Sequence, residues 1–393
     1  MTDKNEIICA LWLKSFEGAG DRTLKTLLEE MGSFEAIYKS KDAKALCEIM
    51  GISPKARKLA ELITTQKSTR SAEEAYAEAE NLGISLTVLS SESYPPLLYE
   101  IYDPPTLLYY KGNIRAVYAM NAAAVVGSRN ADAYGMSVAR EFSAEIARRG
   151  VGVISGLAMG IDSAAHKGAL SVGGITAAVL AGGLNKIFPA SNRPLARQIL
   201  EQDGVLLSEK PPNYPSLPSA FPPRNRIISG LSRLTFVVRA TMKSGSLITA
   251  RSALSQDREV LALPGSILDS LSAGPNSLIK EGAFPVTCPE DIIEVLGCNS
   301  AKANHLPVDF LRCPKSFPAD VSKEDEPRTA KGEKVMTEED SIVEAVFSGL
   351  NTVDAISGEL NMSVAKVASI VTLCELKGKL TANMGKVSAV YRG

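Results

Sequence analysis

The stretch that decides the fold is AAAVVGSRNADAYGMSVAREFSAEIARRG, residues 122–150, followed directly by VGVISGLAMGIDSAAHKGAL, residues 151–170. Each stretch begins with an apolar run typical of a buried strand, turns through Gly and Ser, and continues as a helix. The turns are residues 127–129 (Gly-Ser-Arg) and 155–156 (Ser-Gly). A strand that turns into a helix leaves backbone N–H groups unpaired, and the helix dipole adds partial positive charge there. The two turns therefore predict a site for phosphate groups, with Arg129 beside it.

The same alternation continues to about residue 296. Apolar runs predict strands at 123–126, 152–155, 176–181, 205–208, 234–238 and 260–263, with helical runs between most of them. This pattern predicts an α/β fold with a doubly wound, mostly parallel sheet, covered by helices on both faces. Ligands of such sheets bind beyond the carboxyl ends of the strands. We expect one shared anion-binding rim there, formed by the small loops at 127–129, 155–156, 181–183, 241–246 and 264–266.

Residues 1–80 are predicted to form a small helical domain. Apolar residues repeat with the helical period between Asp21, the expected N-cap, and Gly32, the expected stop. A helix, a glycine-containing turn and a second helix are typical of a helix-hairpin-helix or SAM-like unit, but a purely structural bundle explains the same pattern. Residues 81–298 then hold the sheet domain, whose first part, 84–113, combines short apolar runs with two Pro-Pro pairs.

The C-terminal part is predicted to hold a linker and a second small domain. Residues 299–338 are polar, contain proline and have no hydrophobic period, which is typical of a flexible linker. Residues 339–393 predict a winged-helix domain made of three short amphipathic helices and a hairpin. The helices are expected at 342–347, 353–360 and 364–376, with Ser363 capping the third, and the hairpin at 379–391, with Gly385 at its turn.

Composition excludes several classes of protein. The chain has 393 residues and a formal net charge of -1, which excludes a uniformly basic nucleic-acid binder. Residues 115–294 hold 18 Lys and Arg against 14 Asp and Glu, a net of +4, so a local basic groove stays open. The six cysteines form no C-x-x-C pair and there are two histidines, so we expect no metal, free thiols and a cytoplasmic location. No apolar run has membrane-spanning length and the N-terminus lacks a signal-peptide pattern, so we expect no membrane association.

Basic side chains near the predicted rim are the next candidates for binding. The motif FPPRNRIISGLS (221–232) places Arg224 and Arg226 on either side of Asn225, on what two prolines predict to be a rigid turn. Guanidinium groups held on a rigid turn suit phosphate or base recognition, although a surface ion-pair network is the favoured explanation if the motif stands alone. Lys186 and Lys243 follow glycine-containing or polar turns, from which they could reach a phosphate. A solvated lysine explains Lys186 equally well.

Signals for catalysis are weaker. Asp162 and His166 are spaced i, i+4 on one helix, which suits either an acid/base pair or two structural side chains. In the structural alternative Asp162 orients the helix start and the His166 ring packs inside with a hydrogen bond. No P-loop and no G-x-G-x-x-G motif is present, so we expect neither a nucleotide-hydrolysing P-loop nor a dinucleotide cofactor. The structural alternative is favoured, because no nucleophile motif or metal ligand accompanies the pair.

Six stretches between residues 94 and 296 together resemble the DprA (Smf) family of bacterial DNA-processing proteins. They are YPPLLYEIYDPPTLLYYKG, VVGSRNADAYG, ISGLAMGIDSAAHKGAL, FPPRNRIISGLS, SGSLITARSAL and LALPGSI. The resemblance implies an extended Rossmann-like domain that binds single-stranded DNA through its phosphates without sequence specificity. It also implies a non-enzymatic homodimer that protects incoming DNA and loads RecA during natural transformation, with single-strand-binding protein as a further partner.

Carried over by position, the resemblance implies a phosphate pocket formed by Gly127, Ser128, Arg129, Ser155, Gly156, Lys186, Arg224, Asn225, Arg226, Lys243, Ser244 and Gly245. Two positions depart from the family pattern and are expected near the groove rim. Arg239 stands where members often have glutamate, and residues 274–277 read Gly-Pro-Asn-Ser where Gly-Thr-Asn is commoner.

Two other functions remain open at this point. One is a nucleotide-processing hydrolase that uses Asp162 and His166. The other is an adaptor whose winged helix contacts protein, because Lys366 is the only basic residue within the expected helix 364–376.

Overall fold

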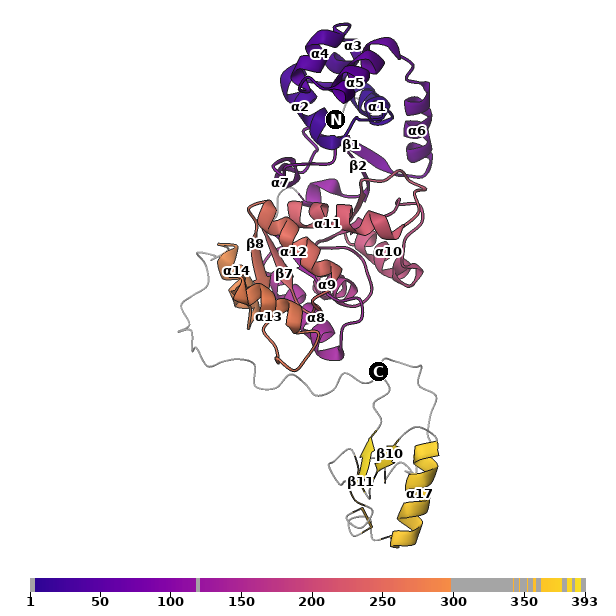
Figure 1. Ribbon diagram of the computed structural model, residues 1–393, viewed down its shortest axis with the longest axis vertical. Coiled ribbons are helices and arrows are strands. Elements are labelled where there is room, and N and C mark those ends of the chain that lie inside the picture. The colour runs from indigo at the N-terminus through magenta and orange to yellow at the C-terminus, as the bar shows by residue number, and fades with distance from the viewer. Residues whose placement is uncertain are drawn as a thin grey trace. The chain divides into compact units, whose positions relative to one another are not determined.

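The computed structural model describes residues 4–117, 121–297 and parts of 342–389. The chain forms two compact units, residues 1–313 and residues 314–393. In the first unit, described strands form a nine-stranded sheet with the order β1-β2-β6-β5-β4-β3-β7-β8-β9. Figure 1 labels β1, β2, β7 and β8 of this sheet. The strands are β1 (Ser85–Val88), β2 (Leu107–Gly112), β3 (Ala122–Val126), β4 (Gly152–Ser155), β5 (Thr176–Leu180), β6 (Val205–Ser208), β7 (Leu234–Val237), β8 (Glu259–Ala262) and β9 (Phe284–Pro285).

The sheet confirms the α/β prediction. Neighbouring strands in the run β6-β5-β4-β3-β7-β8-β9 pair in parallel. At the other end of the sheet, β2 pairs antiparallel with β6, and β1 pairs antiparallel with β2. The order β5-β4-β3-β7-β8-β9 is that of a Rossmann sheet, and β6, β2 and β1 extend it at one edge. The chain runs outward from β3 to β6 and then returns to β7, which lies beside β3, so the strand order reverses between β3 and β7.

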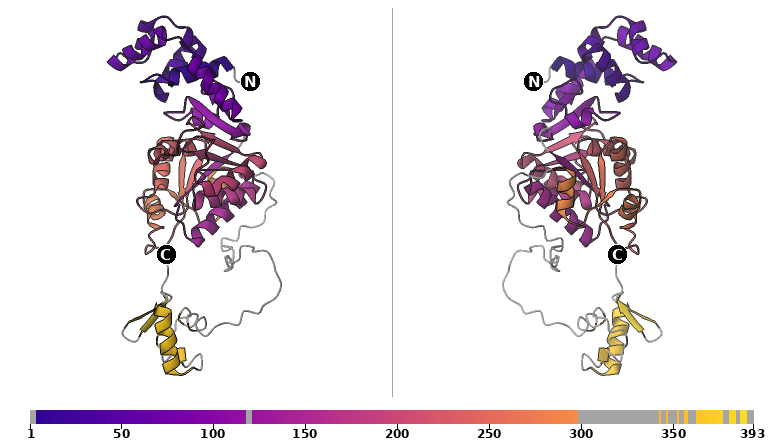
Figure 2. Two further views of the ribbon diagram at one scale, coloured as in Figure 1. Left: turned by 90° about the vertical axis from the view of Figure 1, so that its right-hand side faces the viewer. Right: turned by 90° about the vertical axis from the view of Figure 1, so that its left-hand side faces the viewer.

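Helices cover both faces of this sheet (Figure 2). Alternate residues of β3 point to opposite faces, as the pleat requires: Ala123 and Val125 belong to one hydrophobic cluster, and Ala124 and Val126 to the other. The first cluster contains residues of α8 (Ala133–Arg148), α9 (Ile161–Leu170) and α14 (Pro289–Val295). The second contains residues of α10 (Arg193–Glu201), α11 (Phe221–Gly230), α12 (Gly245–Ser255) and α13 (Ala273–Lys280).

The N-terminal part is helical, as the sequence predicts. Its helices are α1 (Lys4–Lys14), α2 (Asp21–Met31), α3 (Phe34–Lys39), α4 (Ala43–Ile49), α5 (Pro54–Thr65) and α6 (Arg70–Asn81), and α7 (Pro96–Tyr99) follows β1. Gly32 ends α2 with a φ of 81°, which confirms the expected stop. The expected N-cap is wrong, because Gly20 takes that position and Asp21 is the first helical residue. The Asp21 carboxylate instead accepts hydrogen bonds from the backbone N–H and hydroxyl of Thr106.

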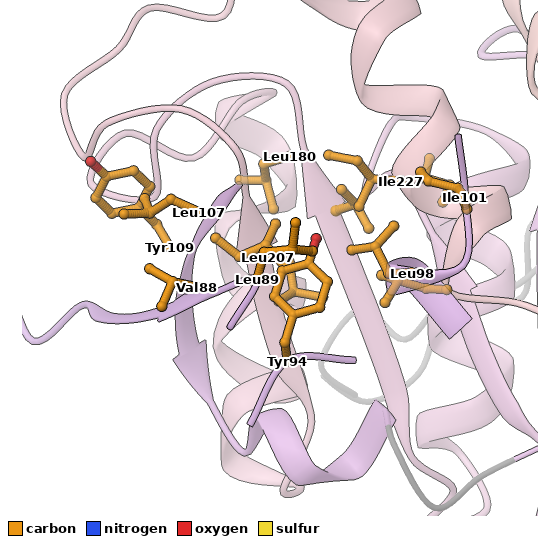
Figure 3. Packing of buried hydrophobic residues seen from close by; sticks show 14 of the residues in the cluster. Val88, Leu89, Tyr94, Leu98, Ile101, Leu107, Tyr109, Leu180, Leu207 and Ile227 are labelled. Atoms are coloured by element: carbon orange, nitrogen blue, oxygen red, sulfur yellow. The ribbon is translucent and has the colours of Figure 1, made fainter. Parts of the chain in front are cut away.

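The helical part and the sheet share one hydrophobic cluster. Figure 3 shows where side chains from β1, α7, β2, β5, β6 and α11 meet in it, among them Val88, Leu98, Leu107, Leu180 and Ile227. Buried Tyr94 donates from its hydroxyl to the carbonyl of Pro105 at 2.7 Å, and burial raises its pKa well above the usual value. The division of this unit into a helical domain (1–80) and a sheet domain (81–298) stays a prediction.

In the second unit the described elements are α17 (Val364–Leu376) and a hairpin of β10 (Leu380–Asn383) with β11 (Lys386–Ala389). The helix has the expected bounds, and the Ser363 hydroxyl accepts a hydrogen bond from the Lys366 N–H at 3.4 Å, as a cap would. The hairpin is also found where it is expected. The linker at 299–338, most of the helices at 342–347 and 353–360, and Gly385 lie outside the described residues, so the winged helix stays a prediction.

Candidate functional site

A pocket of about 480 Å³ opens at the carboxyl ends of β3 and β7. Because the strand order reverses between these two strands, the loops that follow them diverge to opposite faces and leave a crevice between them. The pocket is lined by Val126, Gly127, Ser128, Arg129, Asn130, Ala158, Asp162, Phe221, Pro222, Arg224, Asn225, Ile228, Thr241, Ser244, Gly245, Ser246, Ile248, Thr249 and Leu271.

The loop after β3 forms the first wall of the pocket. The Ser128 N–H donates to the carbonyl of Arg239 at 2.6 Å, and the Ser128 carbonyl accepts from the Ile161 N–H at 3.2 Å. Gly127 permits this packing, since a Cβ there would lie 2.5 Å from Ile161 and 2.8 Å from the Arg239 carbonyl. The fixed loop leaves the Arg129 side chain exposed, with its guanidinium 4.4 Å from the centre of the Phe221 ring.

The first turn of α12 forms the opposite wall. Ser244 occupies the N-cap position, but its hydroxyl bonds to the Ser246 hydroxyl at 2.8 Å and does not cap the helix. Among the hydrogen bonds of the described residues, none satisfies the N–H groups of Gly245 and Ser246, as expected for a first helical turn. Gly245 is exposed, and a Cβ on it would meet nothing within 4 Å, so no neighbouring atom covers its Cα on that side.

Two buried charges form the floor. Arg224, on α11, is 6% exposed and donates to the carbonyls of Gly156, at 2.9 Å, and Val179. Asp162 accepts from the N–H groups of Gly156, at 3.1 Å, and Ala158, at 3.3 Å. Burial raises the pKa of Asp162, which the charge of Arg224 opposes, and burial lowers the pKa of Arg224 to about 10.

The pocket therefore carries net positive charge. Arg224 remains cationic at neutral pH, and together with Arg129 it outweighs Asp162 among the charged lining residues. Two guanidinium groups and the first helical turn of α12, with its N–H groups left without a helical partner, line the same space. This combination suits phosphate, sulfate or carboxylate groups.

Seven of the twelve residues that the sequence predicts line this pocket: Gly127, Ser128, Arg129, Arg224, Asn225, Ser244 and Gly245. Ser155 and Gly156 lie beneath it. The Ser155 hydroxyl donates to the Val125 carbonyl at 2.7 Å and so ties β4 to β3. A Cβ on Gly156 would lie 2.8 Å from both Arg224 Nη1 and Asp162 Oδ2, so glycine allows the floor to form.

The structure turns Arg226 away from the pocket. The expected rigid turn is wrong, because residues 221–230 form helix α11, with the prolines in its first turn. Arg226 pairs with Glu209 at 2.9 Å, Asp103 at 3.1 Å and Asp21 at 3.4 Å. The sequence left an ion-pair network open as the alternative to phosphate binding, and Arg226 lies in such a network.

Lys186 and Lys243 are exposed on the loops after β5 and β7, and neither lines the pocket. The loop at 181–183 does not join the expected rim, because Gly183 donates to the Tyr214 carbonyl at 2.9 Å and packs under residues 211–216. From the loop after β8, Leu271 lines the pocket in place of residues 264–266. Arg239 is 5% exposed and so does not form part of a rim surface.

Sequence reasoning missed several lining residues, among them Phe221, Asn130 and Ser246. Phe221 opens the FPPRNR motif, Asn130 follows the turn at 127–129, and Ser246 ends the loop at 241–246. The sequence places each of them in a candidate loop or motif, but only packing shows which side chains of a motif line the pocket.

Asp162 and His166 have the structural roles that were favoured. His166 is fully buried, and its Nδ1 lies 2.7 Å from the Thr176 hydroxyl, which itself donates to the Val153 carbonyl, so the ring nitrogen is the donor. Burial, helped by the charge of Arg224, lowers the pKa of His166 to about 3 and keeps it neutral. His166 does not line the pocket, so the two side chains do not form an acid/base pair facing a substrate.

The described residues contain no group of three or more His, Cys, Asp or Glu side chains placed to hold a metal ion. Within the same residues, no helix is both long enough and apolar enough to cross a membrane.

Comparison with known proteins gives consistent matches. A family model described as DNA recombination-mediator protein A matches residues 85–297. Protein Smf of Escherichia coli is 52% identical over 206 residues, which cover 52% of this chain and 55% of Smf, so the match spans just over half of that relative. DNA processing protein DprA of Bacillus subtilis is 44% identical over 214 residues, covering 54% of this chain and 72% of that protein. The X-ray structure of DprA from Streptococcus pneumoniae has a TM-score of 0.62 and 34% identity, covering 75% of this chain and 98% of that one.

Proposed function

The chain belongs to the DNA recombination-mediator protein A family, and on that premise we propose that it binds single-stranded DNA and acts as a recombination mediator. The observation that carries the proposal is the pocket between β3 and β7. There Gly245 and Ser246, whose N–H groups have no hydrogen bond among those of the described residues, line the same pocket as Arg129 and Arg224. Phosphate is the group on DNA that matches these donors.

Binding through the pocket is independent of base sequence. Phosphates are the same in every nucleotide, and the charged donors of the pocket, the guanidinium groups of Arg129 and Arg224, suit phosphate. Such binding weakens steeply as salt rises, because each phosphate contact releases a counterion. The small positive excess of residues 115–294 allows few phosphate contacts per chain, so a homodimer would gain affinity by holding one strand at two sites.

The cellular role follows from the family. The two relatives reported above are named for DNA processing or as Smf, and the matching family is described as a recombination mediator. We extend this to a non-enzymatic protein that protects incoming single strands and loads RecA during natural transformation, with single-strand-binding protein as a second partner. The buried, structural roles of Asp162 and His166 support the non-enzymatic part. Among the described residues, the thiols of Cys47 and Cys288 form no disulfide, which supports a reducing, cytoplasmic location.

Changing Arg129 to Ala tests the proposal. We expect affinity for a fluorescently labelled oligo-dT to fall about tenfold, as for loss of one charge-assisted contact. The fall should be equal for oligonucleotides of other sequences. The slope of log affinity against log salt should become shallower by about 0.7, the value for one phosphate on a single strand. Fluorescence anisotropy at several salt concentrations measures both quantities.

Arg70→Ala is the matched control, because Arg70 is an exposed arginine that pairs with Glu74 on α6, a helix that contributes no residue to the pocket. Its affinity should equal that of the unchanged protein. Equal affinity of the Arg129→Ala variant would contradict the assignment of the pocket, and absence of any binding to oligo-dT at low salt would contradict the proposed function.

A further inference from the structure

The loop between β8 and α13 presents two large apolar side chains to solvent. Ile267 is 93% exposed and Leu268 is 92% exposed, whereas the next most exposed large hydrophobic side chain of the described residues, Ile52, is 70% exposed. Two adjacent aliphatic side chains with almost no contacts contribute nothing to the fold, so the fold does not explain them.

The loop that carries this pair is firmly anchored. Arg239, 5% exposed, forms ion pairs with Asp132 and Asp269 and donates to the Ser272 hydroxyl at 2.6 Å. The Leu271 N–H donates to Asp269 at 2.9 Å, and the Leu268 N–H donates to the Ser266 hydroxyl at 3.2 Å. The exposed pair is therefore held out in a fixed position, which lowers the entropy cost of any contact that it makes.

The pair lies close to the phosphate pocket. Leu271 lines the pocket, and its carbonyl accepts from the Ala240 N–H at 2.7 Å. The residue before Ala240 is Arg239, and its backbone carbonyl accepts a hydrogen bond from the N–H of Ser128, which belongs to the opposite wall. Leu268 is three residues before Leu271, so the Cα atoms of the two lie within about 11 Å of each other. A strand whose phosphate occupies the pocket brings its neighbouring nucleotides to this loop.

We propose that Ile267 and Leu268 form an apolar wedge that packs against the faces of unpaired bases, and that this contact makes binding selective for single strands. The inference rests on the proposed function. Phosphates are present on single and double strands alike, so the pocket alone discriminates weakly. Base faces are stacked inside a duplex but open in a single strand, where apolar side chains can pack on them.

Aliphatic side chains suit this role for a binder without sequence preference. They have no hydrogen-bond donors or acceptors and therefore treat the four bases alike. The occupant is a nucleobase, because the loop that carries the wedge also contributes Leu271 to a positively charged pocket that suits phosphate. An interface with a second copy of this chain is the competing occupant, and the experiment separates the two.

The test uses the full chain with both residues changed, Ile267→Ser and Leu268→Ser. Anisotropy is measured with oligo-dT, with an abasic oligomer of the same length and with a duplex. We expect affinity for oligo-dT to fall about five- to tenfold, in the lower part of the range for base contacts. Affinity for the abasic oligomer and for the duplex should not change. The control changes one exposed Ile and one exposed Leu elsewhere, Ile52→Ser with Leu254→Ser, and should leave all three affinities unchanged.

The other outcomes contradict either the proposed function or the wedge. If the unchanged protein does not bind oligo-dT, the proposed function fails. If it binds and the Ile267→Ser, Leu268→Ser variant keeps the same preference for oligo-dT over duplex, the wedge is wrong and the proposed function stands. An equal loss with the abasic oligomer also overturns the wedge. A change from dimer to monomer in light scattering would show that the pair joins two copies of the chain, which overturns the wedge as well.

Discussion

Arg224 and Arg226 stand two positions apart on α11 and have opposite surroundings. Residues of an α-helix are about 100° apart around its axis, so positions i and i+2 point to nearly opposite sides. Arg224 points to the floor of the pocket and donates to Gly156 and Val179. Arg226 points to the acidic side chains of Asp21, Asp103 and Glu209. Helix α11 thus supplies one guanidinium group, that of Arg224, to the pocket and a second, that of Arg226, to the contact with α2.

His166 makes the stability of the protein depend on pH. Its pKa is about 3 in the folded chain and 6.5 when exposed, so stability is fully present above pH 6.5 and is lost as pH falls toward 3. Within that window the unfolding free energy falls by about 1.4 kcal/mol for each unit by which the pH falls. His166→Asn places its Nδ2–H where the ring Nδ1–H stands and so keeps a donor for Thr176, but it does not titrate. Its unfolding free energy should therefore fall less steeply between about pH 6 and pH 4. Urea unfolding followed by circular dichroism measures the two slopes, and equal slopes would contradict the prediction.

The sequence predicts well which residues line the pocket where a backbone turn determines their position. Gly127, Ser128, Ser244 and Gly245 line the pocket because they stand where a strand turns into a helix, which the sequence shows directly. Arg226 was misplaced because the two prolines before it were interpreted as a turn, whereas they occupy the first turn of a helix.

The loop that leads into α9 packs against the loop that carries Arg129. Gly160 has a φ of 74°, and a Cβ on it would lie 2.3 Å from the Ser128 carbonyl oxygen and 2.7 Å from that of Arg129. These neighbours are backbone atoms, which cannot move aside as a flexible side chain can. The position of Arg129 in the pocket therefore depends on glycine at 160.

Gly160→Ala should lower the unfolding free energy by about 1–3 kcal/mol and also weaken binding of oligo-dT, since the loop must shift. Thermal unfolding and anisotropy measure the two effects. Gly20→Ala is the control, because Gly20 has a φ of -71° and a Cβ there meets nothing within 4 Å. A Gly160→Ala variant that matches the control in both measurements would show that the two loops are not coupled.

Elements with a strong hydrophobic pattern were predicted within one residue at each end. Strands β4 and β6 have the expected bounds, because each is a buried apolar run flanked by turn residues. Strand β9, residues 284–285, was missed because two exposed residues carry no periodic signal. The sequence pattern also does not predict that β3 pairs with β7. Which strands become neighbours depends on the crossover connections between them and not on the residues of either strand.

At the scale of the whole first unit, sheet order and helix α11 connect the parts. The reversal of strand order at β3 and β7 creates the pocket. Helix α11 crosses from the pocket, through Arg224 and Asn225, to the N-terminal helices, through the ion pair of Arg226 with Asp21. The N-terminal helices therefore help to hold the helix that forms one side of the pocket.

A crystal structure of the full chain with a short oligo-dT would show whether DNA occupies the pocket. We expect a backbone phosphate in the pocket between β3 and β7, accepting hydrogen bonds from the N–H groups of Gly245 and Ser246 and from the Arg129 guanidinium. An oligonucleotide bound on another surface, with the pocket free of phosphate, would contradict this expectation.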